Sequence, residues 1–173
     1  MKRLTDTGLS HGYIVAMLME SIVAEQVAGE FYKYIAKKTK NSRIKNKFLK
    51  FGDEEAKNHK KLLNKRLKQI IGRTYNINFN RLNTNIKVSK FSLAGALNMA
   101  KESERRAIEF YEEARKIDAK YGKTYNKLAK EEKIHWKIID EEKQKIKDKE
   151  YYKDAKAVKL FALLKQIWKR HKI

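Results

Sequence analysis

Four glutamates fall on the apolar faces of predicted helices, where a charged side chain is unexpected. They are Glu25, Glu55, Glu104 and Glu132. An ionised carboxylate that is buried without a partner either costs several kcal/mol or takes up a proton. Four carboxylates at one level of a bundle would also repel one another. The same faces carry no lysine or arginine, so a pair of divalent or trivalent metal ions fits the need for positive charge.

Two histidines could add nitrogen ligands to these carboxylates. His135 follows Glu132 by three residues, so both side chains share one helical face as a Glu-x-x-His pair. His59 follows Glu55 by four residues and lies within about 40° of the same face. Asn58, three residues after Glu55, could instead ligate weakly through its amide oxygen or leave a coordination position open. Because the chain has no cysteine, the ligands must be oxygen and nitrogen atoms.

Two tyrosines share the helical faces of the glutamates. Tyr32 and Tyr111 follow Glu25 and Glu104 by seven residues, which is almost two full turns. In that position they could hydrogen-bond to ligand carboxylates and hold them in place. The alternative is that both rings pack in the core with a satisfied hydroxyl group.

The elements that must position these residues are four long helices. The 173 residues include no proline and only 7 glycines, so long stretches lack the residues that break helices. Apolar residues recur at helical spacing over four ranges: 10–38, 42–71, 92–118 and 124–147.

The lengths of the connections predict how these helices are arranged. The first and second helices are joined by a few residues, as are the third and fourth, so each pair should form an antiparallel hairpin. About twenty residues, Gly72 to Phe91, join the two hairpins. That length suits a crossover along a bundle, with a separate β-hairpin as the alternative. The predicted fold class is all-α, an antiparallel four-helix bundle with this long crossover and a further C-terminal helix.

The two hairpins repeat one pattern. The segment from Glu25 to Tyr32 agrees with the segment from Glu104 to Tyr111 at five of eight positions, 79 residues apart. The second and fourth helices align at an offset of 77, which pairs Glu54 and Glu55 with Glu131 and Glu132. Agreement in both pairs of helices at nearly one offset predicts a bundle with pseudo-twofold symmetry.

These residues resemble the ferritin-like di-iron carboxylate proteins, most closely the rubrerythrin or erythrin branch without a rubredoxin domain. In such bundles, one Glu from each of two helices joins Glu-x-x-His pairs from the other two. By this resemblance Glu25 and Glu104 match the lone glutamates, and Glu132 with His135 matches the fourth-helix pair. Glu55 matches the second-helix glutamate, with His59 one place late. A further third-helix glutamate of rubrerythrins is replaced by Ala107, which puts peroxide reduction by the rubrerythrin route in doubt.

The resemblance implies two bound iron ions, or manganese, and a reaction with O2 or H2O2. The expected activity is that of an oxidoreductase of ferroxidase or peroxidase type, with electrons taken from iron itself or from an external donor. Related bundles usually pair, so a homodimer is expected. The alternative is a cationic helical bundle that binds nucleic acid or a membrane, with a structural or degenerate metal site.

Charge and the C-terminal region bear on that alternative. The formal net charge is +21, which would attract polyanions. Residues 149–173 are predicted as a basic amphipathic helix that follows a bundle domain of residues 1–148. Its apolar face could pack on the bundle or a second copy, or could lie on an anionic surface. No stretch is long and apolar enough for a signal peptide or membrane span, which predicts a cytoplasmic protein.

Overall fold

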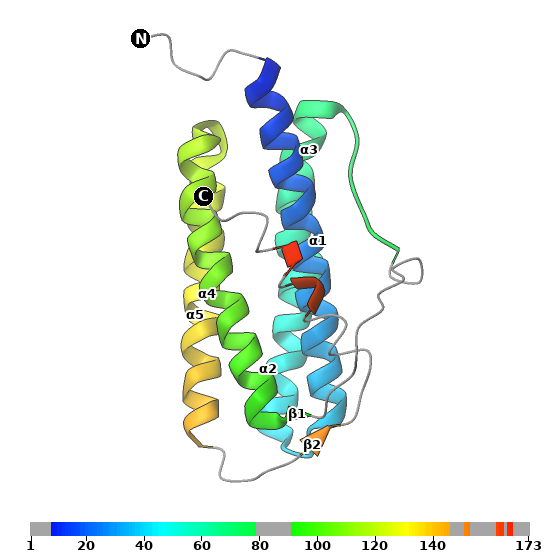
Figure 1. The fold of residues 1–173 in the computed structure, drawn as a ribbon, viewed down its shortest axis with the longest axis vertical. Helices are drawn as coiled ribbons and strands as arrows, with labels where there is room; N and C mark the ends of the chain where they lie inside the picture. The colour runs from blue at the N-terminus through cyan, green and yellow to red at the C-terminus, as the bar shows by residue number, and fades with distance from the viewer. Residues whose placement is uncertain (1–7, 79–90, 146–150, 153–161, 165, 168–173) are drawn as a thin grey trace.

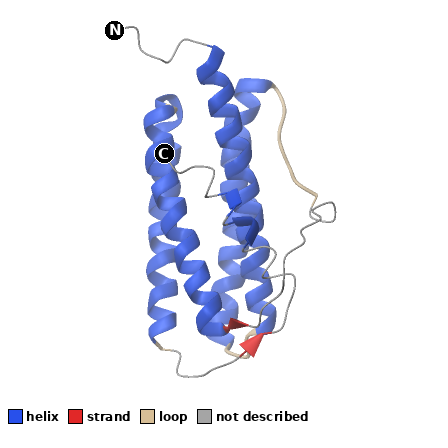
Figure 2. Ribbon diagram, viewed as in Figure 1, coloured by secondary structure: helices blue, strands red, loops and turns tan. Residues whose placement is uncertain are grey.

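The computed structural model describes residues 8–78, 91–145, 151–152, 162–164 and 166–167. Its first hairpin joins α1 (Gly8–Lys38) to a long second helix, and its second hairpin joins α4 (Leu93–Ile117) to α5 (Gly122–Gln144). Figure 1 shows the two hairpins packed side by side with their helices nearly parallel to the long axis. Helices make up most of the described chain, as Figure 2 shows. The predicted all-α bundle with a long crossover is therefore confirmed.

The long second helix has three parts. They are α2 (Ser42–Asp53), the π-helical segment η2 (Glu54–His59) and α3 (Lys60–Ile71). The Asn41 side chain accepts a hydrogen bond from the Ile44 amide at 3.2 Å and so caps the start of α2. The helix ends at Gly72, whose left-handed φ of 74° suits a residue without a Cβ atom.

The connection between the hairpins leaves α3 at one end of the bundle and reaches α4 at the other (Figure 1). Its first residues run back along the first hairpin. Asn64 of α3 exchanges two hydrogen bonds with the backbone of Tyr75, and Gln26 of α1 exchanges two with that of Ile77. These side chains satisfy the backbone N–H and C=O groups of the connection, which has no helix or strand of its own to pair them here. Residues 79–90 lie outside the described part.

A short β1 (Phe91–Ser92) precedes α4 and pairs in antiparallel fashion with β2 (Tyr151–Tyr152). The C-terminal helix predicted over residues 149–173 therefore does not include Tyr151 and Tyr152, because their backbone is extended and hydrogen-bonded to β1. Residues 162–164 and 166–167 are helical, and Leu164 and Ile167 are buried in the same apolar cluster as the bundle core. The rest of the predicted helix lies outside the described residues.

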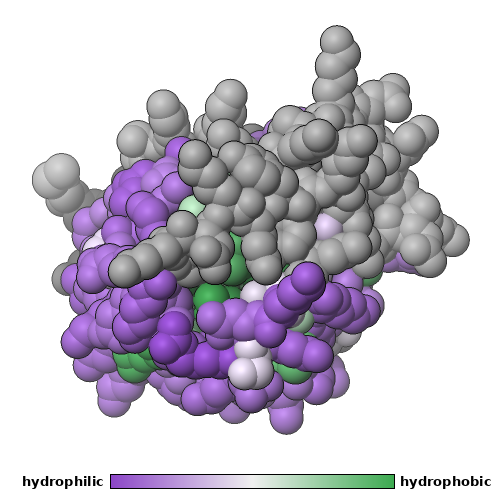
Figure 3. Space-filling view, turned by 90° about the horizontal axis from the view of Figure 1, so that it is seen from below, coloured by the Kyte–Doolittle hydropathy of each residue, from purple (hydrophilic) through white to green (hydrophobic). Residues whose placement is uncertain are grey.

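The core is mostly apolar on either side of the central glutamates, but it also buries the Arg66–Asp118 ion pair and Glu142. Its most deeply buried large side chains include Tyr32, Tyr111, Tyr125, Phe31, Phe48 and Leu18. Seen from the end that carries β1 and β2, the described surface is mostly hydrophilic, with apolar side chains in small separate areas (Figure 3). Among the described helices, none combines the length and apolar character that a membrane crossing requires.

Candidate metal centre

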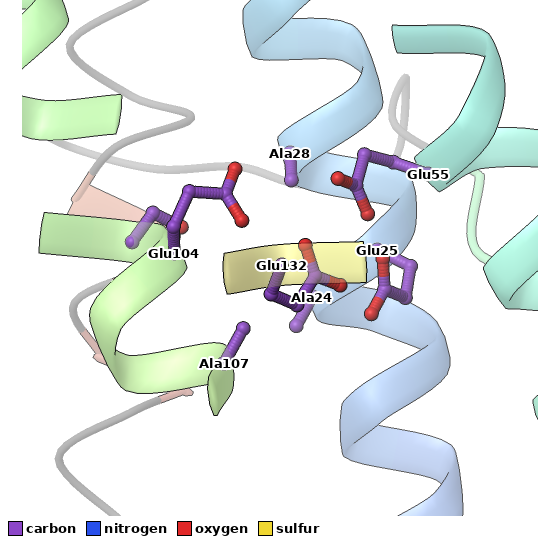
Figure 4. A pocket seen from close by; sticks show the side chains of 8 residues that line it. Ala24, Glu25, Ala28, Glu55, Glu104, Ala107 and Glu132 are labelled. Atoms are coloured by element: carbon purple, nitrogen blue, oxygen red, sulfur yellow. The ribbon is translucent and has the colours of Figure 1, made fainter. Parts of the chain in front are cut away.

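The bundle brings the four predicted glutamates together at its centre. Glu25 comes from α1, Glu55 from η2, Glu104 from α4 and Glu132 from α5. Each residue is at most 4% exposed. Their carboxylates point toward one another across the space between the helices (Figure 4). The expectation that one glutamate of each helix shares a level of the bundle is thus what the structure shows.

Both predicted histidines reach the same place. His59 and His135 are buried, and their rings stack nearly parallel with centroids 6.0 Å apart. Nδ1 of His59 lies 3.0 Å from Glu55, 3.0 Å from Glu132 and 3.4 Å from Glu25. Nδ1 of His135 lies 2.9 Å from Glu55 and 3.2 Å from Glu132. Both rings therefore turn the same nitrogen toward the carboxylates.

These six side chains form two overlapping groups of candidate ligands. The first group consists of Glu25, Glu55, His59 and Glu132; the second consists of Glu55, Glu104, Glu132 and His135. The candidate ligand atoms of each group lie within 4.8 Å of one another, and every residue is buried. Glu55 and Glu132 belong to both groups. Two adjacent ions would fit this arrangement: Glu25 and His59 would hold one, Glu104 and His135 would hold the other, and Glu55 and Glu132 would be available to both.

The π-helical segment explains how His59 joins the site despite its four-residue spacing. The Lys60 amide donates to the carbonyl oxygen of Glu55, five residues earlier, as a π-helical turn requires. This wider turn accommodates one extra residue, so Glu55 and His59 both face the interior. Asn58 is exposed to solvent. The expectation that its amide takes part in the site is therefore wrong, because the π turn directs Asn58 outward.

A close helix contact holds the π-helical segment against α1. A Cβ atom on Gly29 would lie 2.7 Å from Ala56 Cβ and 2.9 Å from the carbonyl oxygen of Gly52. Only glycine at this position lets α1 approach η2 so closely. The contact lies one turn beyond Glu25 in α1 and next to Glu55 in η2, so it sets the distance between two candidate ligands.

The two tyrosines connect the hairpins in a crossed pattern. The Tyr32 hydroxyl donates a hydrogen bond to Glu104, and the Tyr111 hydroxyl donates one to Glu25. Each tyrosine thus orients the lone glutamate of the other hairpin. Burial, followed by the charge of Glu25, raises the pKa of Tyr111 well above its ordinary value, so its hydroxyl stays protonated and can donate.

Two further glutamates contact the histidines from outside, and the sequence reasoning did not assign them. Nε2 of His135 lies 2.9 Å from Glu54, and Nε2 of His59 lies 3.2 Å from Glu131. Each imidazole is therefore held by the glutamate that precedes the shared carboxylate of the opposite hairpin. A carboxylate on the outer nitrogen fixes the tautomer and orientation of a ligand histidine. The repeated Glu-Glu pairs at an offset of 77 were the signal that could have identified these residues.

The four buried carboxyl groups differ in their protonation. Burial, followed by the charge of a neighbouring carboxylate, raises the pKa of Glu25 and Glu104 well above the ordinary value. Burial is the largest influence on Glu55 and disfavours its charged form, yet the charge of His59 and the hydrogen bonds from Glu25 and the two histidines together outweigh it and lower the pKa of Glu55. The pKa of Glu132 is also lowered, since the two histidines outweigh its burial and the charge of Glu55.

The two histidines hold the balancing positive charge. Burial by itself would lower the pKa of both imidazoles. The hydrogen bonds to Glu132 and Glu55 instead raise the pKa of His135 to about 12, and the charges of Glu55 and Glu132 raise that of His59. The directions of these pKa shifts favour two imidazolium ions beside two carboxylates and two protonated glutamic acids. In the absence of metal, protons neutralise the cluster.

The donor set fits hard metal ions. Glu55 Oε1, Glu132 Oε1 and His59 Nδ1 are buried and lie within ion-pair distance of the imidazoles or carboxylates, at 2.9–3.0 Å. None of the three makes a hydrogen bond of satisfactory geometry within the described part of the chain. Buried polar atoms are rarely left without a well-formed hydrogen bond, and a bound ion would satisfy all three. All three atoms face the shared space between the helices, where carboxylate oxygens and imidazole nitrogens are suitable ligands for iron or manganese.

A pocket opens beside the carboxylates on the side of α1 and α4. Small side chains form its wall between the glutamates: Ala24, Ala28, Ser103 and Ala107 (Figure 4). Ala107 is the position where a further glutamate would be expected from the family pattern. Its methyl group and those of Ala24 and Ala28 leave room next to the ligands for a small molecule.

A model of the rubrerythrin family matches residues 16–143, which is most of the chain. The chain belongs to the rubrerythrin family. No curated protein and no solved structure matched it. The matched range spans all four bundle helices and every candidate ligand. The family and the geometry together identify the buried cluster as a candidate di-metal carboxylate site.

Proposed function

We propose that this rubrerythrin-family protein is a di-iron oxidoreductase that oxidises Fe(II) with O2 or H2O2. The observation that carries the proposal is the pair of overlapping ligand groups, which share Glu55 and Glu132. A structural site for one ion would need only one of these groups. Two adjacent ions with shared carboxylates can supply two electrons to one molecule of oxidant.

Iron is the metal that we propose, because its two common oxidation states are both compatible with carboxylate and imidazole ligands. Manganese has the same ligand preferences and is the alternative metal. When bound, two ferrous ions supply the two electrons that, with two protons, reduce one H2O2 to two H2O.

The side chains around the ions would control access and ligand geometry. The pocket beside the carboxylates has small side chains on its wall and little free space, which suits O2 or H2O2 rather than a larger organic substrate. Tyr32 and Tyr111 hold the lone glutamates in place through their hydroxyl groups. Glu54 and Glu131 hold the outer nitrogens of the histidines, so that both Nδ1 atoms face the ions.

The proposal favours Fe(II) itself as the source of electrons. These 173 residues contain no cysteine, so they cannot form the four-cysteine iron centre that could pass electrons to a di-iron site. Ala107 also takes the place of the further third-helix glutamate of rubrerythrins, so the pocket has no carboxylate at that position beyond the four candidate ligands. We therefore place Fe(II) oxidation first and peroxide reduction with an external electron donor second.

Elemental analysis and oxidation assays test the proposal. Protein purified without chelator should hold about two irons per chain, and the doubly substituted protein Glu104→Ala/Glu132→Ala should hold none. The matched control is Glu109→Ala/Glu141→Ala, which removes two exposed glutamates and the same charge. Fe(II) added to the metal-free wild type should be oxidised faster than in buffer, with O2 or H2O2 consumed in proportion.

Two outcomes would contradict the proposal. Metal-free wild type that remains metal-free after incubation with Fe(II) or Mn(II) would show that the cluster is not a metal site. Two bound irons without faster Fe(II) oxidation by either oxidant would show a structural site.

A further inference from the structure

The outer face of α3 carries an uninterrupted row of positive charge. Between Glu55 and Glu102 the sequence contains eleven lysines and arginines and no aspartate or glutamate. Lys61, Lys65 and Lys68 of α3 are exposed, and so is Arg73 just beyond Gly72. No ion pair joins any of these four residues to another described residue. We name these four residues the α3 basic face.

The surface of α4 shows how different this is from an ordinary charged helix. Arg105 pairs with Glu102 at 2.8 Å and also with Glu109. Lys116 pairs with Glu113, and Lys133 of α5 pairs with Glu112 at 2.6 Å. These cations of α4 and α5 are therefore paired with nearby glutamates, whereas no described carboxylate lies within ion-pair distance of the α3 basic face.

The shape and composition of the α3 basic face favour a nucleic acid duplex over a membrane. Lysines 61, 65 and 68 rise about 10 Å along a rigid helix, and one strand of a duplex presents a phosphate about every 3.4 Å along its axis. The apolar face of α3, with Leu63 and Leu67, is buried in the core. The helix thus has no free apolar face to insert into a lipid surface.

The same features favour a duplex over a single strand and a backbone contact over sequence reading. The α3 basic face contains no aromatic side chain on which an unpaired base could stack. Lysines act as point charges toward phosphates and do not distinguish bases when they lie outside the grooves. We infer that the α3 basic face is a binding surface for the phosphate backbone of double-stranded nucleic acid, without sequence preference. This inference does not depend on the metal centre.

The test compares two triple variants of the full-length chain with equal charge. One is Lys61→Gln/Lys65→Gln/Lys68→Gln, and the control is Arg105→Gln/Lys116→Gln/Lys133→Gln, which removes ion-paired cations. Binding to a fluorescein-labelled random-sequence DNA duplex is measured by anisotropy over a range of salt. Circular dichroism and thermal melting verify that each variant keeps the wild-type fold.

We expect the α3 variant to bind the duplex about tenfold more weakly or worse, and the control variant to change about twofold at most. Loss of three phosphate contacts should reduce the slope of log affinity against log salt by about 2.7. When salt is increased from about 50 to about 200 mM, the duplex affinity of the α3 variant should therefore fall by a factor about 40 times smaller than that of the wild type. Lys61→Arg/Lys65→Arg/Lys68→Arg should bind like the wild type.

Three results would overturn the inference. Equal weakening by both variants would show that overall charge, not this face, attracts the duplex. Unchanged duplex binding by the α3 variant would place any contact elsewhere on the chain. Loss of binding to phosphatidylserine vesicles, with duplex binding unchanged, would assign the face to a membrane.

Discussion

The two helical hairpins place the same five side chains around one centre, but they do so with different backbones. Each hairpin contributes a lone glutamate, a tyrosine seven residues later, a Glu-Glu pair and a histidine. In α5 the histidine follows its glutamate by three residues on a regular α-helix. In the first hairpin it follows by four residues on a π-helical turn.

The difference is confined to one turn. Before that turn, buried Phe48 and Phe51 correspond to buried Tyr125 and Leu128 at an offset of 77. After it, buried Leu63 corresponds to buried Ile139 at an offset of 76. The π turn thus absorbs one residue and leaves the core register intact on both sides. Repeated helices can therefore keep a common site although their sequences differ in length.

The largest expected effect is on metal binding, and it distinguishes a glutamate that belongs to both ligand groups from one that belongs to a single group. Glu55→Ala should abolish binding of both ions, because Glu55 belongs to both ligand groups. Glu25→Ala should retain about one ion per chain, held by the group that contains Glu104 and His135. Elemental analysis after removal of loosely bound metal measures both. Equal loss in the two variants would show that the hairpins do not hold separate ions.

A second effect is the release of protons when metal binds. In the metal-free protein the raised pKa values keep one glutamic acid and one imidazolium protonated in each hairpin, Glu25 with His59 and Glu104 with His135. Ligands must lose these protons to coordinate, so binding should strengthen as pH rises and weaken as it falls. Filling both positions should release about four protons.

Calorimetry in buffers of different ionisation enthalpy measures this release. Glu25→Gln should lower it by about one proton, since an amide has no proton to lose. Proton release near zero in the wild type would contradict the charge balance of the metal-free cluster.

A third comparison concerns the glutamates that hold the histidines from the opposite hairpin. Glu131→Gln should lower the affinity for the metal ion at His59 by about 10–100-fold, and Glu54→Gln should lower the affinity for the ion at His135 by a similar factor. Co(II) titration followed by visible absorption can resolve the two positions. Glu141→Gln, on the exposed face of α5, is the control. If each variant instead lowered the affinity for the ion held by the histidine of its own hairpin, the contacts of Glu54 and Glu131 with the opposite histidines would not be what orients the imidazoles.

A fourth comparison tests the close contact that exists only in the first hairpin. Gly29→Ala should lower the free energy of unfolding by about 1–3 kcal/mol, because its Cβ would overlap Ala56 and Gly52. Gly12→Ala, in the same helix with nothing near its Cβ, should instead raise it by about 0.5–1 kcal/mol. Urea denaturation measures both. Ile108 takes the equivalent position in α4, so the second hairpin has no such requirement.

The smallest expected effect is that of deleting Asn58. The deletion should close the π turn into a regular α-helix and create a Glu-x-x-His pair like that of α5, with two ions still bound. Deleting Lys65 from regular α3 should instead displace Arg66 and Leu67 from their buried positions. Elemental analysis and thermal melting distinguish the two. If both deletions removed the metal, the π turn would have a role beyond the accommodation of one residue.

The sequence determined the helices and most of the centre. The helices begin and end within a few residues of the predicted bounds, because apolar spacing, capping residues and the absence of proline act locally. The repeat at offsets of 79 and 77 was enough to bring four glutamates to one level. The position of His135 followed from regular helical geometry, since α5 has no irregularity.

Tertiary structure decided what depends on contacts between helices. The choice between Asn58 and His59 required the π turn, which forms where η2 packs against Gly29 and where Leu63 and Leu67 must still reach the core. On a regular α-helix, Asn58 would lie about 60° to one side of Glu55 and His59 about 40° to the other, so spacing along one helix cannot choose between them.

The contacts of Glu54 and Glu131 were hidden for a related reason. Each binds a histidine of the other hairpin, at 2.9 Å and 3.2 Å, so neither can be assigned from the helix that carries it. The pairing of Tyr151–Tyr152 with β1 likewise joins segments some sixty residues apart along the chain. Local periodicity specifies which face of a helix is buried, and only packing specifies which atoms of another helix that face will meet.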